Sequence, residues 1–495
     1  MHSPVEDSLK NIIKLDKNNS GAIYLQIAQQ LINAIQGGHF TNGTLLPGTR
    51  SLSKLLKIHR NTVVAAYEEL ASQGWVEIVA NKGTFVVKPI SQKSNYSNNS
   101  TQLKNTGFKF YTNAHLTPPY EKISSHYTFN DGQTDIRLHI ATKYNRWYNA
   151  AVKKSSIIKK WNNFSSEQSS FLNTQVCNYV NSARKFHVSP KNILCTQGNE
   201  MNLYLVAQLL LKPKDVVLVG DLSNFSANMI FNQAKANIKT IPVDEEGLDI
   251  NFIRKNFTKN SIRCVYCTPR RHYPTTCALS EQRRVQLLQL ATEYGFAIIE
   301  DDFDFDFEYD SKHIPTLANK DVNGQVIYLG KIGEAVFPAF ELGIIVAPEN
   351  FIKEVKNYYR MLYPQADIIK EQIVATIIYE GELQRQLQKK IIAYKERRDA
   401  MCVALNDNFG TVIKYLKPTG GLAIYIQFVK PINLVQFVDL TLKYDLTIPK
   451  YLLYQSKNRC AIRLGYGHLT CDEINITVQI LKKAYDDLIK NIKQN

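Results

Sequence analysis

Between residues 216 and 346, short apolar segments alternate with stretches that have the period of an amphipathic helix. This alternation constrains the fold most, because apolar strands separated by helices predict a parallel, doubly wound α/β sheet. Ligands of such sheets bind beyond the carboxyl ends of the strands. A helix expected at 281–294, with Val285, Leu288 and Ala291 on its inner face, connects two strands. The strands are expected at Val216–Val219, Ile238–Ile241, Cys264–Cys267, Ala297–Ile299, Val326–Leu329 and Ile344–Val346.

The segments around this region define the domain organisation. After a helical pattern over 352–404, a strand at 422–428, a helix near 434–444, a strand at 460–464 and a last helix after Thr470 predict a smaller α+β subdomain. Residues 91–102 form a polar run with almost nothing to bury, which is typical of a flexible linker. We therefore expect a tail at 1–20, a domain at 21–90, a linker at 91–126 and a body at 127–495, with large and small subdomains at about 140–350 and 351–495.

The N-terminal domain has the pattern of a winged helix-turn-helix. Helices are expected at 24–36, from 51 and at 60–72, followed by a hairpin of 75–79 and 84–87 with Lys82 at its tip. Arg60, Asn61 and Thr62 lie at the start of the third helix, where side-chain donors and the helix dipole can meet phosphates and base edges. A net charge of +16 favours a polyanionic partner. The alternative is a helical bundle that binds protein.

These residues resemble the winged helix of GntR-type bacterial regulators. The matched positions are Leu46-Pro47, Arg50, Leu52, Arg60-Asn61-Thr62-Val63, Tyr67, Leu70, Gly74 and Gly83-Thr84-Phe85-Val86. Gly48-Thr49, Lys57 and His59 depart from the usual family residues and leave the operator sequence open. The resemblance implies contacts to double-stranded DNA from Arg50, Ser51, His59, Arg60, Asn61, Thr62, Lys82, Gly83 and Thr84.

The body resembles fold-type I aminotransferases, and its pairing with the winged helix is similar to the MocR subfamily of GntR regulators. That resemblance implies a homodimer, a DNA operator and a small-molecule effector, with pyridoxal phosphate as the family cofactor. The matched stretches are Asp135-Ile-Arg-Leu138, Thr268-Pro269, Tyr273-Pro274-Thr275, Ile299–Asp304, Tyr328-Leu-Gly330, Phe337-Pro338, Leu342-Gly343, Pro418–Leu422 and Ile462–Gly465.

The cofactor positions implied by this resemblance have changed. An ungapped alignment places Glu334 where the family has the Schiff-base lysine, and a carboxylate cannot form an imine. Glu341 replaces the arginine that would pair with the cofactor phosphate. Phe303 replaces a tyrosine, and Gly198-Asn199-Glu200 departs from the phosphate-cradling sequence. We therefore expect no bound cofactor and no transamination, and treat Gly198, Asn199, Tyr273, Asp301, Phe303, Lys331, Glu334, Glu341 and Arg463 as a degenerate site that could hold an effector.

Three of these residues leave alternatives open. Lys331 could contact an anion, pair with Glu334 or act as a relocated Schiff-base lysine, so covalent or non-covalent cofactor binding is the rival hypothesis. Asp301 is either the partner of the pyridinium nitrogen or a relic that caps a strand end. Arg463 either grips a substrate carboxylate, as in the family, or only bridges the two subdomains.

The remaining polar signals favour structural roles. Cys264 and Cys267 form a C-x-x-C inside an apolar run, which indicates a buried strand more than metal or redox chemistry. The acidic run Asp301, Asp302, Asp304, Asp306, Glu308 and Asp310 lacks the glycine and spacing of a calcium loop, so no metal is expected. There is no apolar signal core or membrane-spanning run, and we expect a soluble cytoplasmic protein.

Overall fold

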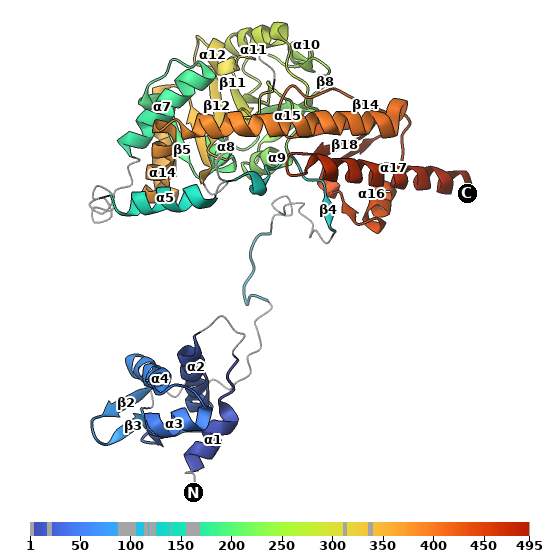
Figure 1. The fold of residues 1–495 in the computed structure, drawn as a ribbon. Coiled ribbons are helices and arrows are strands. Elements are labelled where there is room, and N and C mark those ends of the chain that lie inside the picture. The colour runs from blue at the N-terminus through green and yellow to red at the C-terminus, as the bar shows by residue number, and fades with distance from the viewer. Residues whose placement is uncertain are drawn as a thin grey trace. The chain divides into compact units, whose positions relative to one another are not determined.

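The computed structural model describes residues 4–16, 22–87, 105–112, 117, 125–139, 141–154, 169–309, 314–334 and 340–494. The chain forms two compact units, Met1–Phe110 and Tyr111–Asn495 (Figure 1). The predicted linker run at 91–102 and the Phe337-Pro338 motif lie outside the described residues.

The N-terminal unit contains the predicted winged helix-turn-helix. Its helices are α2 (Ile23–Gln36), α3 (Thr49–Leu56) and α4 (Arg60–Ser72), and its sheet has the order β1 (Leu45–Leu46), β3 (Gly83–Val86), β2 (Val76–Val79). Leu31, Leu52, Val63 and Leu70 are fully buried in one core, as their helical spacing predicts.

A helix in the expected N-terminal tail was not predicted. Helix α1 (Pro4–Ile12) buries Leu9, and Ile13 just beyond it, in the core of the winged helix. Two apolar residues four positions apart pack on one helix face. A run this short gives too little periodicity to be recognised in the sequence.

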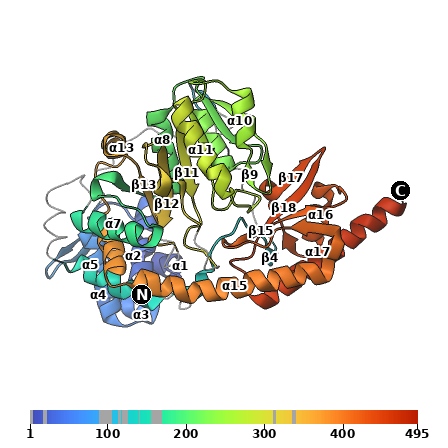
Figure 2. The same cartoon turned by 90° about the horizontal axis from the view of Figure 1, so that it is seen from above.

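The sheet of the body has seven strands in the order β5-β13-β12-β11-β10-β6-β7. Helices α8 (Asn199–Leu210), α9 (Phe225–Gln233) and α13 (Glu349–Leu362) cover one face of the sheet (Figures 1 and 2). Helices α7 (Ser170–Arg184), α10 (Ile250–Asn256), α11 (Glu281–Tyr294) and α14 (Ile368–Tyr379) cover the other face. Cys264 and Cys267 are buried in β10, as predicted. The strands are β5 (Ile193–Thr196), β6 (Val216–Gly220), β7 (Asn237–Ile241), β10 (Cys264–Cys267), β11 (Ala297–Asp302), β12 (Val326–Ile332) and β13 (Leu342–Val346).

The prediction of an all-parallel sheet was wrong for one strand. Strand β13 runs antiparallel to both of its neighbours, β12 and β5, while the other pairings are parallel. A parallel return needs a crossover of about a dozen residues or more. Only residues 333–341 separate β12 from β13, so the chain turns back beside the strand that it has just left.

Helix α11 (Glu281–Tyr294) has the predicted bounds, but its inner face is rotated from the prediction. Val285 is 41% exposed and Leu288 is only partly buried, whereas Leu287 and Leu290 are fully buried together with Ala291, which was predicted on the inner face. The buried face also contains Arg284, whose guanidinium donates to the carbonyls of Leu279, Pro269 and Pro315. A prediction that places only apolar residues on the buried face assigns Arg284 to the solvent. The inner face was therefore predicted on the wrong side of the helix.

The smaller subdomain is built on the antiparallel sheet β14-β15-β18-β17, where the predicted β15 and β18 are the two central strands. The long helix α15 runs from the large subdomain to this sheet and packs against α17 (Figure 2). The strands are β14 (Ile413–Tyr415), β15 (Ala423–Phe428), β17 (Leu453–Ser456) and β18 (Arg459–Gly465). The helices of the body include α5 (Ala141–Val152), α7 (Ser170–Arg184), α8 (Asn199–Leu210), α9 (Phe225–Gln233), α10 (Ile250–Asn256), α12 (Leu317–Lys320), α13 (Glu349–Leu362), α14 (Ile368–Tyr379), α15 (Glu382–Phe409), α16 (Leu434–Lys443) and α17 (Cys471–Gln494).

Short pairings complete the body. Strand β4 (Tyr127–Thr128) pairs in parallel with β16 (Leu446–Thr447), and β8 (Val243–Asp244) pairs with β9 (Gly247–Leu248). The loop after β4 lies against the smaller subdomain, because Gly132 packs beside Leu422 and Gly465.

Candidate functional site

Helix α4 presents its first turn to solvent. Arg60 and Asn61 are exposed and Thr62 is half-buried, while the opposite face of the helix enters the core. The His59 ring Nδ1 accepts a hydrogen bond from the Asn61 backbone nitrogen at 3.3 Å, so His59 acts as the N-cap. The histidine that replaces the usual family residue at position 59 can therefore still cap the start of α4.

Helix α3 supports this surface in two ways. Thr49 Oγ1 accepts a hydrogen bond from Arg60 Nε at 3.2 Å, which holds the arginine beside the start of α3. Lys57 ends α3 with a φ of +54°, the left-handed conformation that a glycine adopts without cost. Lys57, which stands where the family usually has a glycine, therefore strains the backbone, but the turn between α3 and α4 still forms.

Helix α1 brings an acidic side chain to the same face. Ser51 is exposed as expected, but its Oγ donates to Glu6 Oε1 of α1. A direct contact from Ser51 to a phosphate would replace this hydrogen bond. The sequence contained no signal for this contact, since α1 itself was not predicted.

The hairpin tip contains Lys82, which is exposed, and Gly83, whose φ is +124°. A Cβ at Gly83 would lie 2.6 Å from Leu45 Cδ1, so the close packing of β1 also requires a glycine here. Thr84 is the third residue of this hairpin for which the sequence predicts a DNA contact. Thr84 is only 8% exposed because it pairs with Leu46 of β1 and points into the core.

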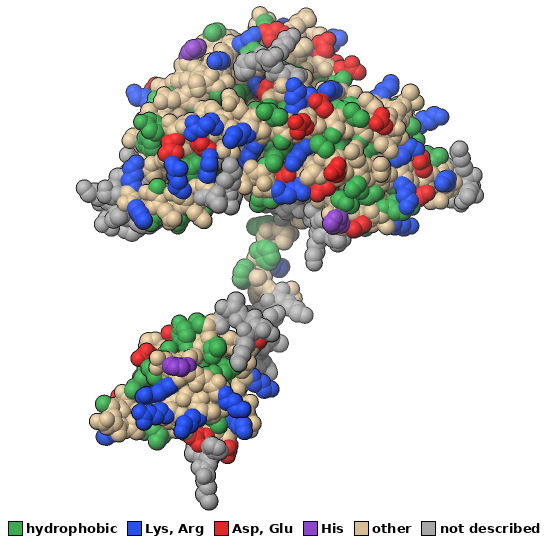
Figure 3. Space-filling view, viewed as in Figure 1, with side chains coloured by type: hydrophobic (Ala, Val, Ile, Leu, Met, Phe, Trp, Pro, Cys, Tyr) green, Lys and Arg blue, Asp and Glu red, His purple; other side chains and the backbone are tan. Residues whose placement is uncertain are grey.

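Lys and Arg side chains gather on the face of the N-terminal unit that Figure 3 shows. Arg50, Arg60 and Lys82 are exposed and form no ion pair with another described residue. Unpaired cations around an exposed helix N-terminus are suited to a polyanion, whose phosphates they can neutralise.

The body contains a pocket of about 360 Å³ at the carboxyl ends of β11 and β12. Its walls come from the loop after β4, the N-termini of α8 and α9, and β18 of the smaller subdomain. The lining residues are Asp131, Gly132, Gln133, Asn199, Glu200, Asn224, Phe225, Ser226, Tyr273, Phe303, Asp304, Phe307, Lys331, Glu334, Glu341, Leu422, Tyr451 and Arg463. The structure therefore brings most of the predicted site residues into one cavity.

Lys331 is neutralised inside the pocket. Its Nζ forms an ion pair with Glu334 Oε2 and lies 4.0 Å from Glu341 Oε2. Burial lowers the pKa of Lys331, but the two carboxylates outweigh it and hold this pKa well above its usual range. Burial raises the pKa of the Glu341 carboxyl, and the nearby Glu334 and Glu200 add to the effect.

The start of α8 is occupied by the chain's own carboxylates. Gly198 is the N-cap, and Glu200 lies in the first turn, where a negative charge is stabilised by the helix dipole. A Cβ at Gly198 would lie 3.6 Å from Glu341 Oε1 and 3.9 Å from Glu200 Oε2, so these two carboxylates meet over the glycine.

Asp301 is buried beside this helix and has both oxygens occupied. Tyr266 Oη donates to one of them at 2.7 Å, and Asn199 Nδ2 donates to the other at 2.9 Å. Burial raises the pKa of Asp301 to about 6 even though both donors lower it. These contacts favour a structural role for Asp301 and Asn199 at the strand end.

Arg463 also has an internal partner. Its Nε donates to Asp131 Oδ1 at 2.6 Å, and its Nη1 donates to the Pro274 carbonyl at 3.0 Å. Tyr273 places its ring 4.9 Å from the guanidinium and donates its hydroxyl to Asp131 Oδ2 at 2.9 Å. Phe303 lies edge-on to Tyr273, with ring centroids 6.2 Å apart. An intrachain carboxylate therefore holds the arginine that was expected to be available for a ligand.

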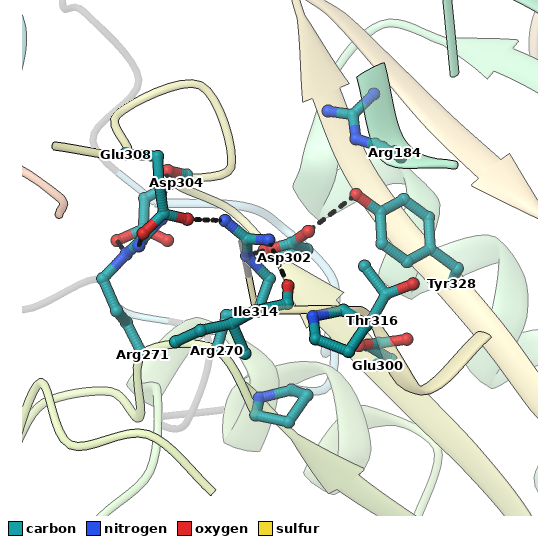
Figure 4. Close-up of polar contacts among 12 residues, drawn as sticks. Arg184, Arg270, Arg271, Glu300, Asp302, Asp304, Glu308, Ile314, Thr316 and Tyr328 are labelled. Carbon is teal, nitrogen blue, oxygen red and sulfur yellow. Dashed lines mark hydrogen bonds and ion pairs between the residues drawn. The ribbon is translucent and has the colours of Figure 1, made fainter. Parts of the chain in front are cut away.

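The acidic run after β11 is paired with arginines that follow β10 (Figure 4). Arg271 Nε binds Asp304 Oδ2 at 2.7 Å, and Arg270 Nε lies 3.2 Å from Asp302 Oδ1. Both arginines also contact Glu308. Within the described ranges no group of His, Cys, Asp and Glu has the arrangement of a metal site, and Asp310 lies outside them.

Sequence reasoning missed Asp131, Arg270 and Arg271. All three lie in loops without periodicity, and their partners are more than 30 residues away. Opposite charge between Arg270-Arg271 and the acidic run was the only available signal.

Each of the two compact units matches a different protein family. Residues 23–86 match the bacterial regulatory proteins of the gntR family, and residues 127–443 match aminotransferase class I and II. The chain is a MocR-type member of the GntR regulators, and its body belongs to the aminotransferase class I and II family. Among the described residues of this regulator, no helix has the length and apolar character needed to cross a bilayer.

Two curated regulators match most of the chain. The HTH-type transcriptional regulator YhdI of Bacillus subtilis is 24% identical, with 96% of this chain and 98% of the relative covered. The probable rhizopine catabolism regulatory protein MocR of Rhizobium meliloti is 21% identical, with 85% of each chain covered. Among solved structures, an archaeal alanine:glyoxylate aminotransferase superposes with a TM-score of 0.66 at 23% identity, covering 74% of this chain and 91% of its own. That likeness shows the aminotransferase fold.

Proposed function

We propose that this MocR-type regulator acts in the cytoplasm as a homodimer that binds a DNA operator, and that its body senses a ligand and does not transaminate. The DNA-binding part rests on the first turn of α4, which is exposed, capped by His59 and accompanied by unpaired cations. Such a turn enters the major groove in helix-turn-helix proteins, and a wing beside it reaches the backbone. The curated relatives, which are named as regulators, support the same function.

The observation that carries the second part is the charge of the pocket. In the family the phosphate of the cofactor lies at the start of the helix equivalent to α8, where this chain places Glu200 and Glu341. Two like charges about 4 Å apart repel by about 4 kcal/mol at the effective dielectric of a protein surface. The residues of this pocket therefore do not fit a dianionic phosphate, and Glu334 offers no amine for covalent attachment.

Lys331 is the basis of the rival function, a regulator that still holds the cofactor. Its ion pair with Glu334 and the elevated pKa of its ammonium oppose that role, because a nucleophilic amine must lose its proton. The rival predicts a borohydride-stable cofactor adduct on Lys331, which peptide mass spectrometry would locate.

The DNA-binding function is tested by selecting operators from a pool of random duplexes with the full chain. We expect enrichment of a palindromic site, because a symmetric dimer presents two α4 helices. Fluorescence anisotropy should then give a binding constant at least about 1,000-fold tighter for that site than for random DNA. Equal affinity for all duplexes, or no binding, would contradict the proposal.

A further inference from the structure

Helix α1 is an addition to the winged helix-turn-helix that the family match does not include. The match to the gntR family begins at residue 23, whereas α1 spans Pro4–Ile12. Leu9 of α1 is fully buried, and Ile13 just beyond it is 5% exposed, in the core that α2, α3 and α4 share. The burial of these two apolar side chains ties α1 to the DNA-binding unit.

The segment after α1 is fixed to α2 by paired hydrogen bonds. The Lys14 backbone nitrogen donates to Gln30 Oε1 at 2.8 Å, and Gln30 Nε2 donates back to the Lys14 carbonyl at 2.9 Å. Gln26 forms the same reciprocal pair with the backbone of Asp16, at 3.1 and 3.0 Å. Two side-chain amides of α2 therefore hold this segment in one place, and the fold determines where the side chains of α1 lie.

Helix α1 packs against α3 and places Glu6 beside the surface assigned to DNA (Figure 1). Ser51 Oγ donates to Glu6 Oε1, and Ser51 directly follows Arg50 in the first turn of α3. Thr49 of the same turn accepts from Arg60 Nε at 3.2 Å, so this turn adjoins the start of α4. A carboxylate therefore lies one hydrogen bond away from the turn that carries Arg50.

A carboxylate at this position competes with a DNA phosphate for the same donor. Serine hydroxyls and the first turns of helices both donate to phosphate oxygens in protein–DNA interfaces. The first turn of α3 follows Gly48, which has no side chain to cap it. A phosphate that approached Ser51 would meet the charge of Glu6, and like charges repel more strongly where water is displaced. Glu6 therefore opposes the contact that Ser51 could make.

We propose that Glu6 is an autoinhibitory group that occupies the phosphate position beside Ser51 and lowers the affinity of the winged helix for DNA. This rests on the proposed DNA-binding function and adds an internal competitor to the same surface. When DNA binds, the hydrogen bond between Ser51 and Glu6 breaks, and Ser51 donates to the phosphate instead. The competition acts on every duplex alike, because phosphate contacts carry no sequence information directly.

An anisotropy titration of the full chain tests the proposal with the selected operator and with a random duplex. Glu6→Gln keeps an oxygen that can accept from Ser51 but removes the charge. We expect binding at least about threefold tighter to both duplexes, because the repulsion from a nearby phosphate is lost. The affinity should also depend more steeply on salt, by up to about one released counterion. Asp7→Asn is the matched control, since it removes the same charge from the next residue of α1, which is exposed, and should leave both affinities nearly unchanged.

Unchanged or weaker binding by Glu6→Gln would overturn the proposal. An equal gain from Asp7→Asn would overturn it too, because the gain would then follow from net charge alone. Thermal unfolding of the same samples identifies a purely structural role, since a less stable winged helix with unchanged DNA affinity would mean that Glu6 only supports α3. A natural chain that binds no duplex refutes the DNA-binding function, whereas a natural chain that binds DNA without a gain in Glu6→Gln refutes only the autoinhibitory contact.

Discussion

The two units of this regulator use charge in opposite ways. On the winged helix, Arg60 and Lys82 are exposed and form no ion pairs within the described part of the chain. In the pocket of the body, Lys331 and Arg463 are turned toward carboxylates of their own chain. The exposed cations of the winged helix are therefore available to a partner, whereas the two cations of the pocket are already paired within the chain.

The comparison also shows what sequence drift changed in the aminotransferase fold. The sheet, its helical layers and a pocket beyond the strand ends are present. We infer from the resemblance that carboxylates stand where groups that hold a phosphate would lie. Fold and site are thus separable, since function depends on the site and not on the architecture. The following experiments test whether the internal pairs of the body and the exposed cations of the DNA unit differ as we infer.

The largest effect is expected at the buried pairs of the body. Arg271→Met should leave Asp304 in the interior without its cation and destabilise the body by about 3–5 kcal/mol. Differential scanning calorimetry of the full chain measures the loss as a lower melting temperature of the body. Arg254→Met is the matched control, because its pair with Glu293 is exposed and worth at most about 1 kcal/mol. Equal shifts in both variants would contradict an internal charge network.

A smaller effect is expected on the DNA unit. Arg60→Ala should weaken operator binding by about 1–3 kcal/mol and broaden sequence preference, since a base contact is lost. Lys82→Ala should weaken binding to all duplexes alike and reduce the salt dependence by about one phosphate contact. Anisotropy titrations at several salt concentrations distinguish the two variants. If neither substitution changed binding, the assignment of this surface to DNA would be wrong.

The smallest effect concerns the turn between α3 and α4. Lys57→Gly should stabilise the N-terminal unit by about 0.5–1 kcal/mol, because glycine adopts the positive φ without strain. Lys54→Gly, inside α3, should instead destabilise it by about 1 kcal/mol. Thermal unfolding of both variants gives the signs, and a loss of stability in Lys57→Gly would mean that the lysine side chain stabilises the turn.

The elements with strong periodicity were predictable from the sequence. Helices α2, α4 and α11 begin and end within a residue of their predicted bounds, and the six predicted strands of the large sheet are all present. Helix α1 and β5 were missed, because both are short and have weak patterns. The direction of β13 was also missed, because strand direction depends on the length of the connection and not on the strand residues.

The sequence predicted which residues belong to the site, but not the distant residues that pair with them. The resemblance brought Asn199, Asp301, Lys331, Glu334 and Glu341 to one place, and the pocket contains or adjoins all of them. The partners that determine their chemistry were not visible: Asp131 holds Arg463 from a loop 332 residues away in sequence. Thr84 lies in the wing as predicted, but its strand pairs with β1 opposite Leu46, and its side chain is buried. Tertiary pairing, which no single motif encodes, decided these cases.

The central claim is that the pocket rejects the family cofactor because its charge is reversed. It is tested most directly by an equilibrium titration of the full chain with pyridoxal phosphate, followed by absorbance and calorimetry. We predict no tight binding by the natural chain, little rescue by Glu334→Lys alone, and clear recovery in the double variant Glu334→Lys with Glu341→Arg, limited by Glu200 and Phe303. Micromolar binding by the natural chain, or a cofactor adduct on Lys331, would contradict the account.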